Sequence, residues 1–253
     1  MKAQNRLAYA AVALAVLGAA CGDDDATGPG PLPASASYQG TYGDPMNVGT
    51  LSITFVSPVA HVMGGRGGAV RSPAAPITAA ATLELSGAGS ISLTGSVDNG
   101  VLTLSGGGYT LSGALNGGKA GGSSTGPNGD GVFQALSSPA GAEASIICGH
   151  YEGTLPDDEP DTGNFYMVAS GGVLAIVYHS DGGDNGGFVG TIDAENTINA
   201  RATASDPDIG NVTLTVSGDI NEDRTAALGV YSLTGGGATW GGEWAGSTAA
   251  CGA

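Results

Sequence analysis

Short runs with the character of β-strands fill the chain from residue 38 onward, separated by turn-forming residues at regular intervals. The runs are rich in Val, Ile, Leu and Thr, and Gly, Asn, Asp or Ser interrupts them about every eight to twelve residues, a spacing typical of sandwiches and barrels. No window here shows the period of about 3.6 residues that marks an amphipathic helix. The sequence therefore predicts an all-β fold. The clearest strand candidates are residues 48–56, 81–86, 90–97, 101–105, 109–115, 173–180, 188–193, 197–204, 212–220 and 226–233.

The linkers between these candidates are short, which predicts neighbouring antiparallel strands in a meander. One linker, Asp98-Asn99-Gly100, contains the Asn-Gly pair that is the strongest short signal of a β-hairpin. Two longer segments, residues 57–76 and 116–131, are rich in Gly, Pro or Ser, and we expect both to be surface loops.

The candidate strands also repeat. The tetrapeptide at residues 38–41 (YQGT) matches residues 151–154 (YEGT), residues 110–113 (TLSG) resemble residues 215–218 (TVSG), and a Cys-Gly pair occurs at Cys148 and again at Cys251. We infer two related β domains, residues 38–148 and 149–253, each a small up-and-down barrel or sandwich. A single fused barrel is the alternative.

The N-terminus has the features of an export signal. Lys2 and Arg6 precede a 14-residue apolar run at residues 7–20, which is too short to cross a bilayer and is typical of the apolar region of a signal peptide. Residues 1–20 are therefore expected to be removed from the mature protein.

Residues 17–21 (LGAAC) resemble the lipobox of bacterial lipoprotein signal peptides, with Gly18 in a place where that class prefers Leu. The resemblance implies that Cys21 carries the lipid (diacylglycerol and palmitate) and that residues 21–37, which are polar and rich in Gly and Pro, form a flexible tether. It also implies anchoring in the cell envelope, with Gly22 after the cysteine favouring the outer membrane. The alternative is an ordinary signal peptide cleaved near Ala20.

Charge narrows the classes of partner. Charged residues are 12% of the chain and hydrophobic residues 41%, which argues against an intrinsically disordered protein. Acidic residues outnumber basic ones 23 to 7, so binding to nucleic acid is excluded. Residues 149–253 hold 15 of the acidic and two of the basic residues, so this half should attract cations, although solubility alone would also explain it.

The two cysteines that remain after Cys21 are Cys148 and Cys251. Beyond the inner membrane the environment is oxidising, and two remaining thiols in an exported protein usually pair. We expect a Cys148–Cys251 disulfide that closes the second half of the chain.

Acidic loops in the second half are weak candidates for a calcium site, because carboxylate oxygens are the preferred ligands of Ca²⁺. Loops of this kind also carry Asp simply because its side chain caps turns. The candidate ligands are Asp157, Asp158, Asp161, Asp181 and Asp184.

Trp240 and Trp244 are four residues apart on a candidate final strand and therefore point to one face. With Tyr231 and Tyr166 they could line the mouth of a barrel that binds a small apolar ligand, or they could belong to a core. The sequence has no complete catalytic or cofactor-binding motif, and we expect no cofactor. The leading hypothesis is a non-enzymatic binding or structural module that contacts a ligand or another envelope protein, and an envelope hydrolase is the remaining alternative.

Overall fold

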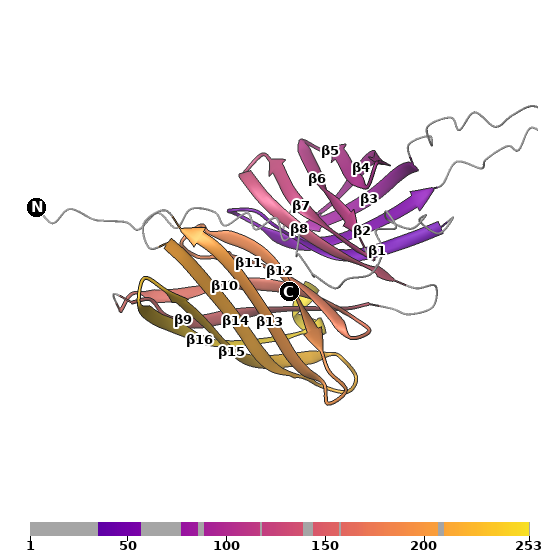
Figure 1. The fold of residues 1–253 in the computed structure, drawn as a ribbon. Helices are drawn as coiled ribbons and strands as arrows, with labels where there is room; N and C mark the ends of the chain where they lie inside the picture. The colour runs from indigo at the N-terminus through magenta and orange to yellow at the C-terminus, as the bar shows by residue number, and fades with distance from the viewer. Residues whose placement is uncertain are drawn as a thin grey trace, which may run out of the picture.

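The computed structural model describes residues 35–56, 77–85, 89–116, 118–138, 144–156, 158–206 and 210–252. The predicted signal peptide, Cys21, most of the predicted tether and the predicted loop at residues 57–76 lie outside these ranges. The described chain forms two closed barrels of eight antiparallel strands each (Figure 1). The predicted all-β fold with two related meander halves is confirmed.

In both barrels each strand pairs with its neighbour in the sequence, and the last strand pairs with the first. The first barrel consists of β1 (Ser35–Gly43), β2 (Val48–Val56), β3 (Ile77–Leu85), β4 (Gly89–Asp98), β5 (Val101–Gly106), β6 (Tyr109–Asn116), β7 (Lys119–Gly126) and β8 (Gly129–Ser138). The second consists of β9 (Ser145–Thr154), β10 (Pro160–Ser170), β11 (Val173–Ser180), β12 (Asn185–Ile192), β13 (Thr197–Asp206), β14 (Gly210–Ile220), β15 (Ala226–Gly235) and β16 (Ala238–Ser247), followed by the 3₁₀-helix η1 (Thr248–Gly252).

The hairpin predicted at Asn99-Gly100 joins β4 to β5, and both residues have positive φ, 49° and 79°. This is the conformation that a two-residue turn between twisted strands requires. The expected loop at residues 116–131 is wrong, because it contains β7 and the start of β8. Strand β7 consists mostly of small residues, and its inward-facing Ala120 and Ser124 are 1% and 3% exposed. It therefore packs beneath large neighbours although its own hydrophobicity is low.

The repeat motifs fall on equivalent strands of the two barrels. The two YxGT motifs lie in β1 and β9, and the two TxSG motifs lie in β6 and β14. The Cys-Gly pairs are not equivalent, since Cys148 lies inside β9 and Cys251 lies in η1. The second barrel therefore begins at Ser145, before the expected boundary at residues 148 and 149, and β1 begins at Ser35, within the segment expected to be tether.

Large buried side chains fill the first barrel. They come from every one of its strands except β7, which contributes Ala120, and they form one continuous cluster. The largest of those that are less than 2% exposed are Tyr42, Phe55, Phe133, Leu51, Ile53, Leu83, Leu93, Leu102, Leu104 and Leu111.

The two barrels also pack against each other along apolar strand faces, with β1 and β8 of the first against β10, β11 and β12 of the second. One contact cluster joins Val48 and Val132 to Tyr166 and Val177, and another joins Leu136 to Val168 and Ala175. Within the described ranges, no helix has the length and apolar character needed to span a bilayer.

Candidate functional site

The second barrel encloses a cavity of about 190 Å³ that is lined by residues from all eight of its strands. Buried aliphatic side chains fill the barrel at the end where β10 runs into β11. They include Ile147, Leu174, Ile192, Ile198 and Ile220, all at most 5% exposed. The cavity therefore opens at the opposite end, where β9 turns into β10 and β11 turns into β12.

Aromatic rings form the walls. The chain has two Trp, eight Tyr and four Phe, and both Trp, three of the Tyr and two of the Phe line this one cavity. Tyr151 meets Tyr231 edge to face with ring centroids 5.5 Å apart, and Phe165 meets Trp244 in the same way at 5.7 Å. Edge-to-face pairs of this kind stabilise a core beyond the area they bury.

Glycines in the surrounding strands make room for these rings. A Cβ atom at Gly218 or Gly229 would lie 2.6 or 2.7 Å from Cζ2 of Trp244, and one at Gly149 would lie 2.7 Å from Cζ of Phe165. Real Cβ atoms do not approach this closely, and at each position a Cβ would also meet a backbone oxygen of the neighbouring strand, so glycine is needed there both for the strand pairing and for the rings. Part of the high glycine content is therefore explained by the packing of aromatic rings inside a narrow barrel.

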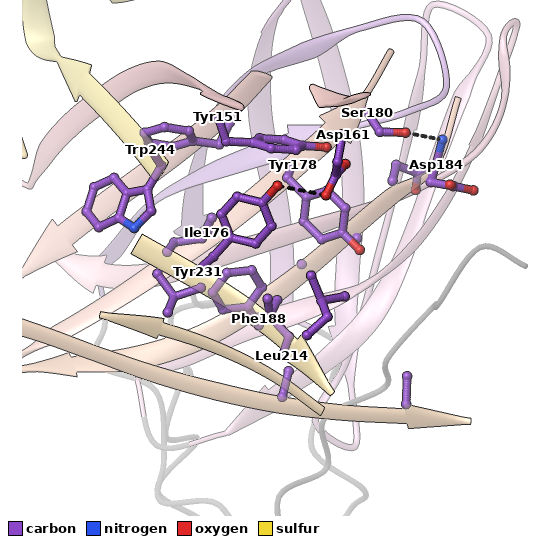
Figure 2. A pocket seen from close by; sticks show the side chains of 18 of the residues that line it. Tyr151, Asp161, Ile176, Tyr178, Ser180, Asp184, Phe188, Leu214, Tyr231 and Trp244 are labelled. Atoms are coloured by element: carbon purple, nitrogen blue, oxygen red, sulfur yellow. Dashed lines mark hydrogen bonds between the residues drawn. The ribbon is translucent and has the colours of Figure 1, made fainter. Parts of the chain in front are cut away.

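A few polar groups interrupt the apolar wall near the mouth. The Tyr231 hydroxyl donates a hydrogen bond of 2.7 Å to Oδ2 of Asp161 (Figure 2). At the rim, Ser180 Oγ accepts a hydrogen bond of 2.9 Å from the backbone amide of Asp184. Burial raises the pKa of Asp161 above its ordinary value, and the hydrogen bond from Tyr231 opposes that shift.

The tyrosines around Asp161 stay protonated at neutral pH. Burial raises the pKa of Tyr178 to about 12, with the charges of Asp184 and Asp161 adding to the shift. Burial also raises the pKa values of Tyr151 and Tyr231, and Asp161 reinforces both shifts. The cavity thus offers neutral phenol groups and aspartate carboxylates, and among the described residues its lining includes no Lys, Arg or His.

Three of the four aromatic residues singled out from the sequence meet in the cavity: Trp240, Trp244 and Tyr231. Tyr166 does not, because side chains alternate along β10 and its neighbours Phe165 and Met167 point inward. Tyr166 is instead buried against Val48 of the first barrel and lines a separate hollow between the barrels.

The acidic candidates separate into different environments. Asp161 and Asp184 line the cavity, Asp181 accepts a hydrogen bond of 2.6 Å from Thr162, and Asp158 is a turn residue with φ of 64°. Asp157 lies outside the described residues. In the part of the chain that the structure covers, no three His, Cys, Asp or Glu side chains are grouped so that they could hold a metal ion, so the calcium hypothesis gains no support there.

Cys148 and Cys251 form a disulfide across 103 residues of sequence. It joins the first strand of the second barrel to η1, directly after the last strand. The bond therefore joins the beginning and the end of the chain segment that forms the barrel with the cavity.

The sequence interpretation missed Tyr151, Tyr178, Phe165 and Phe188. The signal that could have found them is alternation, because on each strand every second residue faces the barrel interior.

Comparison with known proteins adds little. No family model matches the sequence, and no curated protein matches it. A crystal structure from Nitrosomonas europaea, described as a "putative AttH", is 11% identical, and the match covers 85% of this chain and 91% of that one with a TM-score of 0.23. At that TM-score the similarity carries no argument about fold or function.

Proposed function

We propose that this chain is a non-enzymatic, lipid-anchored protein of the cell envelope whose second barrel binds a small and largely apolar ligand. The observation that carries the binding proposal is the aromatic cavity in the second barrel. Ligand pockets are typically concave, apolar and aromatic, with a few placed polar groups, and this cavity has that composition.

The size of the cavity limits the ligand. An apolar cavity of about 150 Å³ holds one benzene molecule. At about 190 Å³, the cavity suits a compound with one ring, or one end of a longer molecule that extends through the mouth. The first barrel, whose interior is a continuous buried cluster, serves in this proposal as the structural partner of the binding barrel.

The hydrolase alternative would need a nucleophile with a base, or two carboxylates placed around a substrate bond. Ser180 lines the cavity, but the neighbouring His179 follows the opposite face of β11 and lines the hollow between the barrels, as does His150. Ser180 Oγ is instead bonded to the amide of Asp184. These positions favour binding over hydrolysis.

The envelope location rests on the sequence of the N-terminus. A cationic start, an apolar run and Cys21 follow one another as in lipoprotein signal peptides. In cells, we expect the wild-type protein in the membrane fraction, specifically in the outer membrane. Cys21→Ala should move the protein to the soluble fraction. Continued membrane association of Cys21→Ala would contradict the lipid anchor and leave the binding proposal unaffected.

The binding proposal is tested by tryptophan fluorescence, because both tryptophans line the cavity. Titration with neutral one-ring compounds (benzene, toluene and 2-phenylethanol) should give a saturable change in emission. Ala202→Phe places a ring in the cavity and should abolish the change, whereas Thr203→Phe, at the adjacent exposed position of β13, should retain it. If none of the compounds gives a saturable change, or Ala202→Phe responds like the wild type, the binding proposal is wrong.

A further inference from the structure

The charged side chains that line the cavity are all acidic. Asp161 and Asp184 supply carboxylates, and in the part of the chain that the structure describes no cationic side chain lines the cavity. A buried anionic group of a ligand would therefore have no partner of opposite charge, which is costly in an apolar site. The proposed ligand site favours a molecule whose polar end is a hydrogen-bond donor or a cation.

Asp161 has the geometry to receive such a group. Its one hydrogen bond from Tyr231 goes to Oδ2, and each carboxylate oxygen can accept more than one donor. In Figure 2, Asp161 lies beside Tyr151, Tyr178 and Tyr231, and its Oδ2 faces the Tyr231 hydroxyl. A cation bound to Asp161 would also lie beside these rings, and a cation over the face of an aromatic ring gains further attraction.

The rim of the barrel extends the same charge outward. The turn from β9 to β10 carries Asp158 and Glu159, and the turn from β11 to β12 carries Asp181 and Asp184. Both turns lie at the mouth of the cavity, and the described residues of these turns include no Lys or Arg. Clefts lined by one sign of charge concentrate ions of the opposite sign, so the mouth attracts cations.

We propose, building on the ligand-binding function above, that the second barrel recognises a small apolar amine, with the ammonium group on Asp161 and the apolar body among the rings of Tyr231, Phe188 and Trp244. The charge-assisted hydrogen bond to Asp161 fixes the orientation, since the other end of the barrel is filled by aliphatic side chains.

Three compounds that share a phenyl-alkyl body test this proposal: 2-phenylethylamine, 2-phenylethanol and 3-phenylpropanoate. Calorimetric titration of the wild-type protein should give an affinity for the amine at least tenfold above that for the alcohol, and no measurable binding of the carboxylate. In Asp161→Asn the amine should lose this preference and bind no tighter than the alcohol.

A further variant separates the role of Asp161 from the general effect of negative charge at this end of the barrel. Asp158→Asn removes one negative charge from an exposed turn at the same end, and Asn tolerates the positive φ there, so the amine preference should persist.

The outcomes distinguish this inference from the binding proposal. If the alcohol binds in the cavity and the amine binds no tighter, or if Asp161→Asn keeps the amine preference, the amine inference is wrong and the binding proposal stands. If the carboxylate binds most tightly, the inference is also wrong. If none of the three compounds binds, the binding proposal itself fails.

Discussion

Two aspartates, one in each barrel, accept a hydrogen bond from a tyrosine and yet have different roles. Asp44 is fully buried, and its oxygens accept from the Tyr42 hydroxyl at 3.0 Å and from the backbone amides of Met46 and Asn47 at 2.8 Å each. The oxygens of its carboxylate are therefore already occupied by hydrogen bonds that stabilise the turn. Asp161 has one tyrosine donor and faces a cavity, so its carboxylate remains available to a ligand.

This arrangement predicts that Asp161 destabilises the empty protein. Its folded pKa is raised above the ordinary 3.8, so its contribution to the free energy of unfolding falls as the pH rises from 3.8 through the folded pKa. Asp161→Asn should therefore melt at the same or a higher temperature than the wild type at neutral pH, with the difference disappearing in acid. Melting followed by tryptophan emission across a pH series measures this. A variant that is less stable at neutral pH would show that Asp161 is structural.

Gly229 leaves space beside the ring of Trp244, and adding a side chain there should disturb the cavity wall. A Cβ at this position would lie against the backbone oxygen of Ser217 on the neighbouring strand and 2.7 Å from Cζ2 of Trp244, so Gly229→Ala must shift that strand, the indole or both. Overpacking of this kind costs about 1–3 kcal/mol of unfolding free energy, and it should shift the emission of Trp244. Gly182→Ala is the control, because its Cβ would meet nothing closer than Ser180 Oγ at 3.4 Å. Equal stability of the two variants, measured by urea unfolding, would contradict the tight fit.

At the scale of strands, the sequence pattern predicted those strands whose own residues favour the β conformation. The candidates at residues 48–56 and 173–180 coincide with β2 and β11, because β-branched runs between turn residues leave little choice. The strand β7 was missed, since a strand of Gly, Ser and Ala has no hydrophobic signature of its own and is held by Phe133 and other large neighbours. The sequence could predict that Trp240 and Trp244 point to one face of their strand. It could not predict that Tyr166 points outward, because that depends on which residues of β10 face the barrel interior.

The disulfide acts at the scale of elements, because it ties β9 to η1 across 103 residues. Closing a loop of about 100 residues in the unfolded chain stabilises the folded state by about 4–5 kcal/mol in the chain-entropy model. The double variant Cys148→Ser/Cys251→Ser should therefore unfold at a much lower urea concentration, followed by tryptophan emission, which reports only the second barrel. An unchanged midpoint would mean that the bond does not stabilise the barrel.

At the scale of the whole molecule, one topology supports two different interiors. Leucine-rich layers fill the first barrel, while glycines and aromatic rings leave the second one hollow. This difference was beyond sequence reasoning, because it depends on the summed volume of side chains from eight strands whose facing directions are set by closure. Apolar side chains join the filled barrel to the hollow one, so we expect the two to unfold together.

Coupling between the barrels can be measured through Leu136 on β8. This side chain is 4% exposed and packs against Val168 and Ala175 of the second barrel. Leu136→Ala should cost about 2–5 kcal/mol and lower the unfolding midpoint seen by Trp240 and Trp244, although both tryptophans lie in the other barrel. The exposed control Val101→Ala should leave that midpoint unchanged. A tryptophan transition at the wild-type midpoint in Leu136→Ala would show that the barrels unfold independently.

The most direct test of the central claim, that the second barrel is a ligand site, is a crystal structure of the protein soaked with 4-bromobenzylamine. The account predicts an anomalous bromine peak inside the second barrel, with the ring between Tyr231 and Trp244 and the ammonium group within hydrogen-bonding distance of Asp161. An empty second barrel, with bromine found only on the outer surface, would contradict it.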